Sequence, residues 1–123
     1  MIEVTEQNAH KYHRYMWRWL ARNVGYAKRD WPGWREIKNS NSHCFACMLA
    51  DKRAGEQNIG NDGGFAHCSV CPITEWRENV TDGRRNSEPA CRVCNSAFEK
   101  WETVWDDDEE SRLATVISEM EWE

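Results

Sequence analysis

The 123-residue chain has the length of one domain, and its 30% charged and 40% hydrophobic residues are typical of water-soluble proteins. It contains no run of 18 apolar residues and no signal-peptide stretch near Met1, which excludes a spanning helix and predicts a cytoplasmic protein. The net charge of −5 is uneven: residues 1–38 carry eight Lys/Arg against four Asp/Glu, whereas residues 99–123 carry two against ten.

The N-terminal part begins with a predicted amphipathic helix. From Thr5, a suitable cap residue, apolar residues recur at three- and four-residue steps as far as Gly25, which fits a helix stop. The apolar positions are Ala9, Tyr12, Met16, Trp19 and Leu20. His13 and Trp17 fall on a flank of that face.

A Trp-rich turn follows this helix. Asp30 is a candidate cap and Pro32 fits the first turn of a short helix, while Trp31 and Trp34 are predicted to join the core. The chain then divides into a helix and Trp-rich turn at 1–38, a cysteine-rich region at 39–98 and an acidic helix at 99–123. We predict one mainly helical domain, residues 1–123, organised around a zinc knuckle site with little or no β-structure.

All six cysteines fall in C-x-x-C pairs, the spacing of zinc knuckles. The pairs are Cys44/Cys47, Cys68/Cys71 and Cys91/Cys94. Two such pairs complete the tetrahedral thiolate shell that zinc prefers, and the βαβ context of a redox pair is missing. The sequence therefore predicts at least one structural Zn²⁺, with the ligands Cys44, Cys47, Cys68 and Cys71.

The third pair leaves two alternatives. Either Cys91 and Cys94 bind a second zinc ion with His43 and His67, or a single site draws on Cys94 and leaves other cysteines as buried thiols. A fully thiolate site is closed to water. Its binding energy therefore stabilises the fold and supplies no Lewis acid.

The C-terminal part predicts two helices. The first runs from residue 90 to 105 and follows the spacing of Cys94, Phe98, Trp101 and Trp105. The second begins with an acidic run that serves as linker, cap and first turn: Asp106, Asp107, Asp108, Glu109 and Glu110. Its predicted apolar face consists of Leu113, Val116, Ile117 and Met120.

Motifs for catalysis are incomplete. The zinc deaminase pattern fails because neither His43 nor His67 has the required Glu two residues later. Residues 83–100 resemble the second half of HNH nucleases, but His67 is the only histidine between the first and third cysteine pairs, so the pair that activates water is missing. His10 and His13 have no third ligand nearby and are interpreted as surface or packing residues. We predict a protein without catalytic residues.

Several stretches, taken in order, support a resemblance over nearly the whole chain. They are residues 13–21, 30–34, 44–47, 68–73, 98–101 and 114–122. Their order and spacing resemble a group of small zinc-binding proteins of bacterial phages and prophages with paired C-x-x-C motifs. The resemblance implies a phage-type accessory protein made in a bacterial cytoplasm. The group has no established activity, so the resemblance implies no catalytic residue.

Charge and this resemblance favour a non-enzymatic module that engages a host protein through residues 106–110, in its sharpest form an inhibitor of a host defence nuclease, like anti-CRISPR proteins. The alternatives are a degenerate HNH-like nuclease and nucleic-acid binding by the basic N-terminal part, with Trp31 or Trp34 stacking on bases. Its basic residues are Lys11, Arg14, Arg18, Arg22, Lys28 and Arg29. The three arginines at four-residue spacing are also typical of a solvated helix face. No membrane partner is expected.

Overall fold

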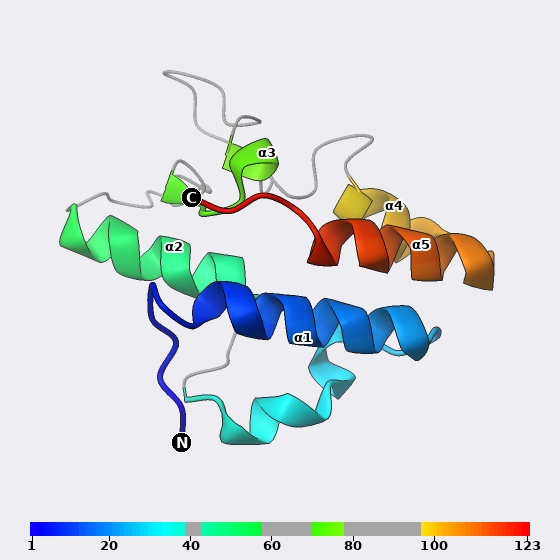
Figure 1. The fold of residues 1–123 in the computed structure, drawn as a ribbon, viewed down its shortest axis with the longest axis horizontal. Coiled ribbons are helices and arrows are strands. Elements are labelled where there is room, and N and C mark those ends of the chain that lie inside the picture. The colour runs from blue at the N-terminus through cyan, green and yellow to red at the C-terminus, as the bar shows by residue number, and fades with distance from the viewer. Residues whose placement is uncertain (39–42, 58–69, 78–96) are drawn as a thin grey trace.

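The computed structural model describes residues 1–38, 43–57, 70–77 and 97–123, and these ranges are mainly helical (Figure 1). The α-helices are α1 (Ala9–Arg22), α2 (Phe45–Glu56), α3 (Thr74–Arg77), α4 (Ala97–Thr103) and α5 (Asp107–Ser118), and the 3₁₀ turns are η1 (Lys28–Asp30) and η2 (Pro32–Glu36). Within these ranges, β-pairing is limited to two isolated bridges, Ile2 with Ile37 and Ile73 with Trp122. The prediction of a mainly helical chain is confirmed for the residues described.

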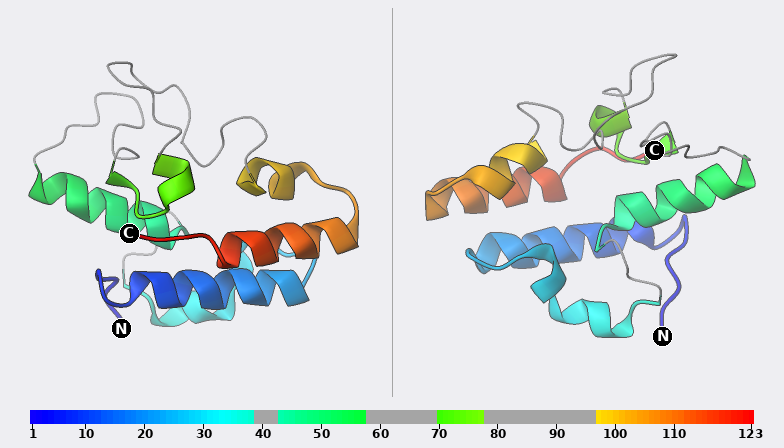
Figure 2. Two further views of the ribbon diagram at one scale, coloured as in Figure 1. Left: turned by 45° about the horizontal axis from the view of Figure 1, so that its top comes forward. Right: turned by 180° about the vertical axis from the view of Figure 1, so that it is seen from behind.

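Helix α1 lies at the centre of the described structure. Helix α5 runs antiparallel along it, α2 contacts it, and α4 packs on α5 (Figures 1 and 2). The turns η1 and η2 lie on the opposite side of α1 from α2 and α5 (Figures 1 and 2). One helix therefore connects the Trp-rich turn, the cysteine-bearing helix and the acidic helix.

Helix α1 begins later than the sequence predicts. Thr5 does not cap the helix; its backbone N–H donates to the Asn8 side chain at 2.7 Å, and its carbonyl accepts from the Ala9 N–H at 3.0 Å. Thr5 thus starts a turn that leads into the helix at Ala9. Beyond the other end, Gly25 has a φ of +89°, a left-handed conformation that glycine adopts without strain.

The predicted position of His13 and Trp17 on a flank of the core face is wrong. Both side chains are buried, because α4 and α5 cover that side of α1. The Trp17 ring meets Trp101 edge to face at 4.8 Å between centroids and Phe98 at 6.0 Å. The buried face of α1 is consequently wider than the spacing of its apolar residues predicts.

The Trp-rich turn packs on the first residue of α2. Phe45 is fully buried, stacks on Trp34 at 4.6 Å and meets Trp31 edge to face at 5.7 Å. A Cβ on Gly33 would lie 2.3 Å from the Trp31 ring, so any other residue there would displace that ring. The prediction that the Trp pair belongs to the core is confirmed for Trp34, whereas Trp31 is only partly buried and packs against the core. Base stacking by the buried Trp34 is therefore not supported.

The start of the Trp-rich turn differs in detail from the expected helix. The Asp30 carboxylate accepts from the Ala27 N–H at 2.7 Å and thus closes η1 instead of capping the next turn. Pro32 opens η2, as its fixed φ and missing N–H favour. Two short 3₁₀ turns replace the single short helix.

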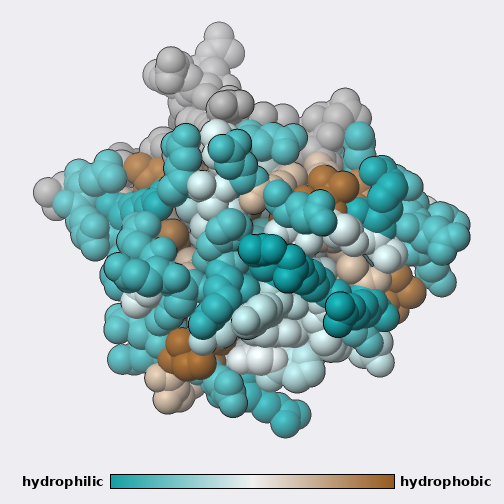
Figure 3. Space-filling view, viewed as in Figure 1, coloured by the Kyte–Doolittle hydropathy of each residue, from teal (hydrophilic) through white to brown (hydrophobic). Residues whose placement is uncertain are grey.

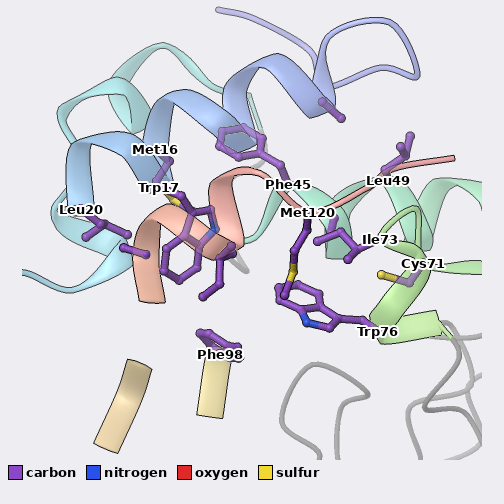
Figure 4. Packing of buried hydrophobic residues seen from close by; sticks show 14 of the residues in the cluster. Met16, Trp17, Leu20, Phe45, Leu49, Cys71, Ile73, Trp76, Phe98 and Met120 are labelled. Atoms are coloured by element: carbon purple, nitrogen blue, oxygen red, sulfur yellow. The ribbon is translucent and has the colours of Figure 1, made fainter. Parts of the chain in front are cut away.

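The core continues into α3 and the C-terminal part (Figure 4). Trp76 on α3 is buried, and Leu113, Ile117 and Met120 are buried as predicted. Two expectations fail. Trp105 lies after the end of α4 and is 98% exposed, and Val116 is 39% exposed, because α5 turns Ala114 and Ser118 toward the core.

Candidate metal centre and interaction surfaces

Cys44 and Cys47 stand at the start of α2. Cys44 is the N-cap residue in an extended conformation, and its sulfur accepts a hydrogen bond from the Cys47 backbone N–H at 3.2 Å. The pKa of the Cys44 thiol is lowered to about 6, first by a hydrogen bond with the Cys47 side chain and also by the charge of Lys28. Both sulfurs therefore lie together, in the arrangement that a C-x-x-C knuckle needs to hold one zinc ion.

Cys71 belongs to the second pair and is buried beside the same helix. It belongs to the same buried cluster as Leu49 of α2 and Trp76 of α3 (Figure 4). Further along α2, the Arg53 guanidinium donates to the Val70 carbonyl at 3.2 Å. Helix α2 therefore carries the first cysteine pair at its start and contacts the segment of the second pair along its length.

Arg53 also fastens both ends of the described chain to α2. Its guanidinium donates to both carboxylate oxygens of Glu6, at 2.7 and 2.8 Å, and to the Glu123 carbonyl at 2.7 Å. Nearby, Thr74 N–H donates to the Glu121 carbonyl and Glu123 N–H to the Pro72 carbonyl. The C-terminal residues thus pair with the segment that directly follows Cys71.

The predicted set of zinc ligands includes residues outside the described ranges. Among residues 1–38, 43–57, 70–77 and 97–123, no three His, Cys, Asp or Glu side chains form a group that could hold a metal ion. Cys68, Cys91, Cys94 and His67 lie outside these ranges. His43, proposed for a second site, packs its ring edge to face against Trp34 at 5.2 Å.

The acidic run has mostly internal partners. The Asp106 carboxylate caps α5 by accepting from the Glu109 N–H at 2.9 Å, as predicted. Glu109 forms an ion pair with Arg112, and Glu110 accepts from the Gly25 N–H at 2.8 Å. These three acidic residues therefore stabilise the helix start and its contact with the end of α1.

Asp107, Asp108 and Trp105 remain as an exposed group at the same end of α5, which we name the acidic tip. The two carboxylates are exposed and form no hydrogen bond or ion pair within the described part of the chain. The Trp105 side chain is 98% exposed. An exposed tryptophan beside two solvated carboxylates offers an apolar contact and a negative field together.

His13 is a buried polar contact between α1 and α5. Its Nε2 lies 2.8 Å from the Ile117 carbonyl, to which the neutral ring donates, and burial lowers its pKa to about 4. His10 instead stacks on Trp122 at 4.8 Å. The interpretation of both histidines as surface or packing residues agrees with these contacts.

Acid should therefore weaken the fold through His13. An unfolded histidine takes up a proton near pH 6.5, but the buried ring resists protonation until about pH 4. The unfolded state binds more protons between these values, so the free energy of unfolding should fall by about 3 kcal/mol as the pH drops from 6.5 to 4. Urea unfolding at successive pH values measures this slope.

The variant His13→Gln can still donate to Ile117 but has no titrating ring, and it should show a flatter slope than the parent. His10→Gln is the matched control and should retain most of the pH dependence of the parent's free energy of unfolding. Loss of zinc in acid would affect all three proteins alike, so the difference between the slopes is the readout. Equal slopes for the parent and His13→Gln would contradict the assignment.

Comparisons with known family models, with curated proteins and with solved structures found no match. None of the described helices is long and apolar enough to span a membrane. Function is therefore inferred from the residues and their geometry.

Two features of this geometry have little signal in the sequence. Arg53 is one basic residue among several, and its four acceptors come from residues 6, 70 and 123. Trp105 fits a helical repeat with Trp101, yet α4 ends at Thr103. The adjoining acidic run, which is favourable at a helix start, is the one local signal that a new helix begins there.

Proposed function

We propose that this chain is a zinc-stabilised, non-enzymatic module that binds a partner protein through the acidic tip. The observation that carries the proposal is the 98% exposure of Trp105 beside the solvated Asp107 and Asp108. The partner surface is basic and contains a recess for the indole ring. In the narrowest form of the proposal, the chain is a phage-type accessory protein and the partner is a host defence nuclease, whose nucleic-acid groove is basic.

Tryptophan supports this choice over charge alone. An exposed indole leaves a large apolar surface in water, and tryptophan is enriched among the residues that dominate binding energy in protein interfaces. An isolated surface charge pair, by contrast, contributes about 0–1 kcal/mol. We therefore assign affinity mainly to Trp105, and orientation and association rate to the two aspartates.

The second part of the proposal is the zinc ion. Cys44 and Cys47 fit one half of a thiolate site, because their sulfurs share a hydrogen bond and the backbone of Cys47 donates to one of them. Cys68 and Cys71 would supply the other half. The second pair would join the site through the contact of its segment with α2 at Arg53. When bound, zinc cross-links these segments and so holds α2 against the C-terminal residues.

A capture experiment tests the partner surface. The zinc-loaded chain is immobilised, exposed to bacterial lysate and compared with two variants, Trp105→Ser and Asp107→Asn/Asp108→Asn. Leaving Asp106, Glu109 and Glu110 unchanged keeps the cap and the contact with Gly25. Glu119→Gln/Glu121→Gln removes the same charge at the far end of α5, where both side chains are exposed, and is the matched control.

The parent and the control should retain the same specific protein. Trp105→Ser should weaken its binding by roughly 30-fold or more, the effect of losing an interface hot spot. The double aspartate variant should mainly slow association and reduce its dependence on salt. Equal capture by all variants, each shown to be folded by circular dichroism, would contradict the acidic tip as the binding surface.

A further inference from the structure

The solvent face of α1 carries three arginines in one line. Arg14, Arg18 and Arg22 are exposed and four residues apart, so about 6 Å of helix rise separates successive side chains. They point away from the buried residues of the same helix, which are Ala9, His13, Met16, Trp17 and Leu20. We name these residues the arginine stripe. Figure 3 shows the most hydrophilic colour over α1 on the face that it presents.

The arginine stripe makes no internal ion pair. Within the described ranges the ion pairs are Lys52 with Glu3, Arg53 with Glu6 and Arg112 with Glu109. None of them includes an arginine of the stripe, and no carboxylate of α1 lies between its members. Three guanidinium groups therefore keep their donors for an external acceptor, and phosphate is an acceptor that arginine binds with two parallel hydrogen bonds.

An aromatic side chain stands within this face. Tyr15 follows Arg14 directly and is 50% exposed, and its ring is held edge to face by Tyr12 at 6.1 Å between centroids. A half-exposed aromatic ring beside cations is the combination that binds single-stranded nucleic acid, where phosphates meet cations and bases stack on aromatic rings. It differs from the acidic tip in both charge and position.

We propose that the arginine stripe and Tyr15 form a binding surface for single-stranded nucleic acid. The overall negative charge does not prevent this, because the acid is concentrated at the start of α5. That helix start is tied to the end of α1 by the contact of Glu110 with the Gly25 N–H. Arg14 lies about 12 Å of helix rise from Arg22, beyond the screening length of about 8 Å at physiological salt. Arg14 therefore contributes more to binding than Arg22.

Fluorescence anisotropy with a labelled mixed-sequence oligodeoxynucleotide tests the proposal. Three phosphate contacts predict that the logarithm of the affinity falls with the logarithm of the salt concentration with a slope of about −2. The variant Arg14→Gln/Arg18→Gln/Arg22→Gln should bind roughly tenfold or more weakly at low salt and lose most of the slope. Glutamine keeps the helix propensity of arginine, so this variant should remain folded.

Three further measurements distinguish binding by the arginine stripe and Tyr15 from non-specific attraction by any basic side chains. Arg35→Gln/Lys38→Gln/Lys52→Gln removes the same charge from exposed residues outside α1 and should leave the affinity nearly unchanged. Tyr15→Ser should weaken binding without changing the salt slope, and the matching duplex should bind less tightly than the single strand. No binding by the parent, or equal loss with both triple variants, would overturn the proposal. Duplex binding that is unaffected by Tyr15→Ser would overturn its single-stranded form.

Discussion

Chelation of zinc is expected to unfold the protein. Structural zinc contributes about 10–16 kcal/mol of apparent binding energy in zinc-finger peptides at pH 7, whereas a whole domain of ordinary size has a net stability of about 5–15 kcal/mol. Removal of the ion should therefore lower the free energy of unfolding by about as much as the whole net stability of the domain. Circular dichroism should show loss of helix after addition of a chelator, and a zinc indicator should detect about one or two ions released per chain.

Cysteine substitutions test which residues bind the predicted zinc ion. Cys47→Ser removes a proposed ligand of the first pair, leaves α2 its cap at Cys44, and should abolish zinc binding at the site of Cys44, Cys68 and Cys71. The double variant Cys91→Ser/Cys94→Ser decides between the alternatives for the third pair. It lowers the zinc content from two ions to one if the pair forms a second site, and from one ion to none if a single site draws on Cys94. A chain purified with zinc in the medium that contains no zinc by mass spectrometry, and that keeps its helix in chelator, would contradict a structural site.

Truncation of Phe45 is expected to have the largest effect among core substitutions. Its side chain has no exposed surface and contacts the rings of Trp31, Trp34 and Tyr12 at 4.6–5.9 Å between centroids. Phe45→Ala would leave a cavity among these rings, and such truncations cost about 3–5 kcal/mol. Urea unfolding of the zinc-loaded protein measures the loss.

The position of Phe45 gives this prediction a second consequence. The residue directly follows Cys44, so loosening the ring cluster also loosens the start of α2. Zinc affinity should therefore fall together with stability. Val116→Ala, on the exposed side of α5, is the matched control and should change stability by about 0.5 kcal/mol or less. A loss for Phe45→Ala no larger than that of the control would show that the cluster is not part of the core.

The two proposed surfaces meet at one contact between α1 and α5. Ser111 donates to the Ala21 carbonyl at 2.7 Å and Gly25 donates to Glu110 at 2.8 Å, so the start of one helix is tied to the end of the other. The acidic tip therefore lies at the end of the arginine stripe occupied by Arg22. Because the two surfaces use separate side chains, substitutions in one leave the side chains of the other in place, although neutralising the acidic tip should strengthen the contribution of Arg22, which lies nearest to it.

Local chemistry decided much of the fold. The mainly helical class follows from the spacing of apolar residues, and the start of α5 follows from Asp106, whose carboxylate satisfies a backbone N–H that any helix start leaves unpaired. The burial of Trp34 agrees with the prediction that the Trp-rich turn joins the core. The zinc ligands remain a prediction from spacing, since three cysteines and His67 lie outside the described ranges.

The sequence by itself thus determined the helical class, the cap of α5, the burial of Trp34 and the exposure of the arginines of α1. Only the tertiary structure decided the burial of His13, the exposure of Trp105 and the contacts of Arg53. His13 is buried because α5 places the Ile117 carbonyl over it, and Trp105 is exposed because α4 ends before it. Arg53 joins segments far apart in the chain. Such contacts depend on how helices pack, and no local spacing of residues encodes that.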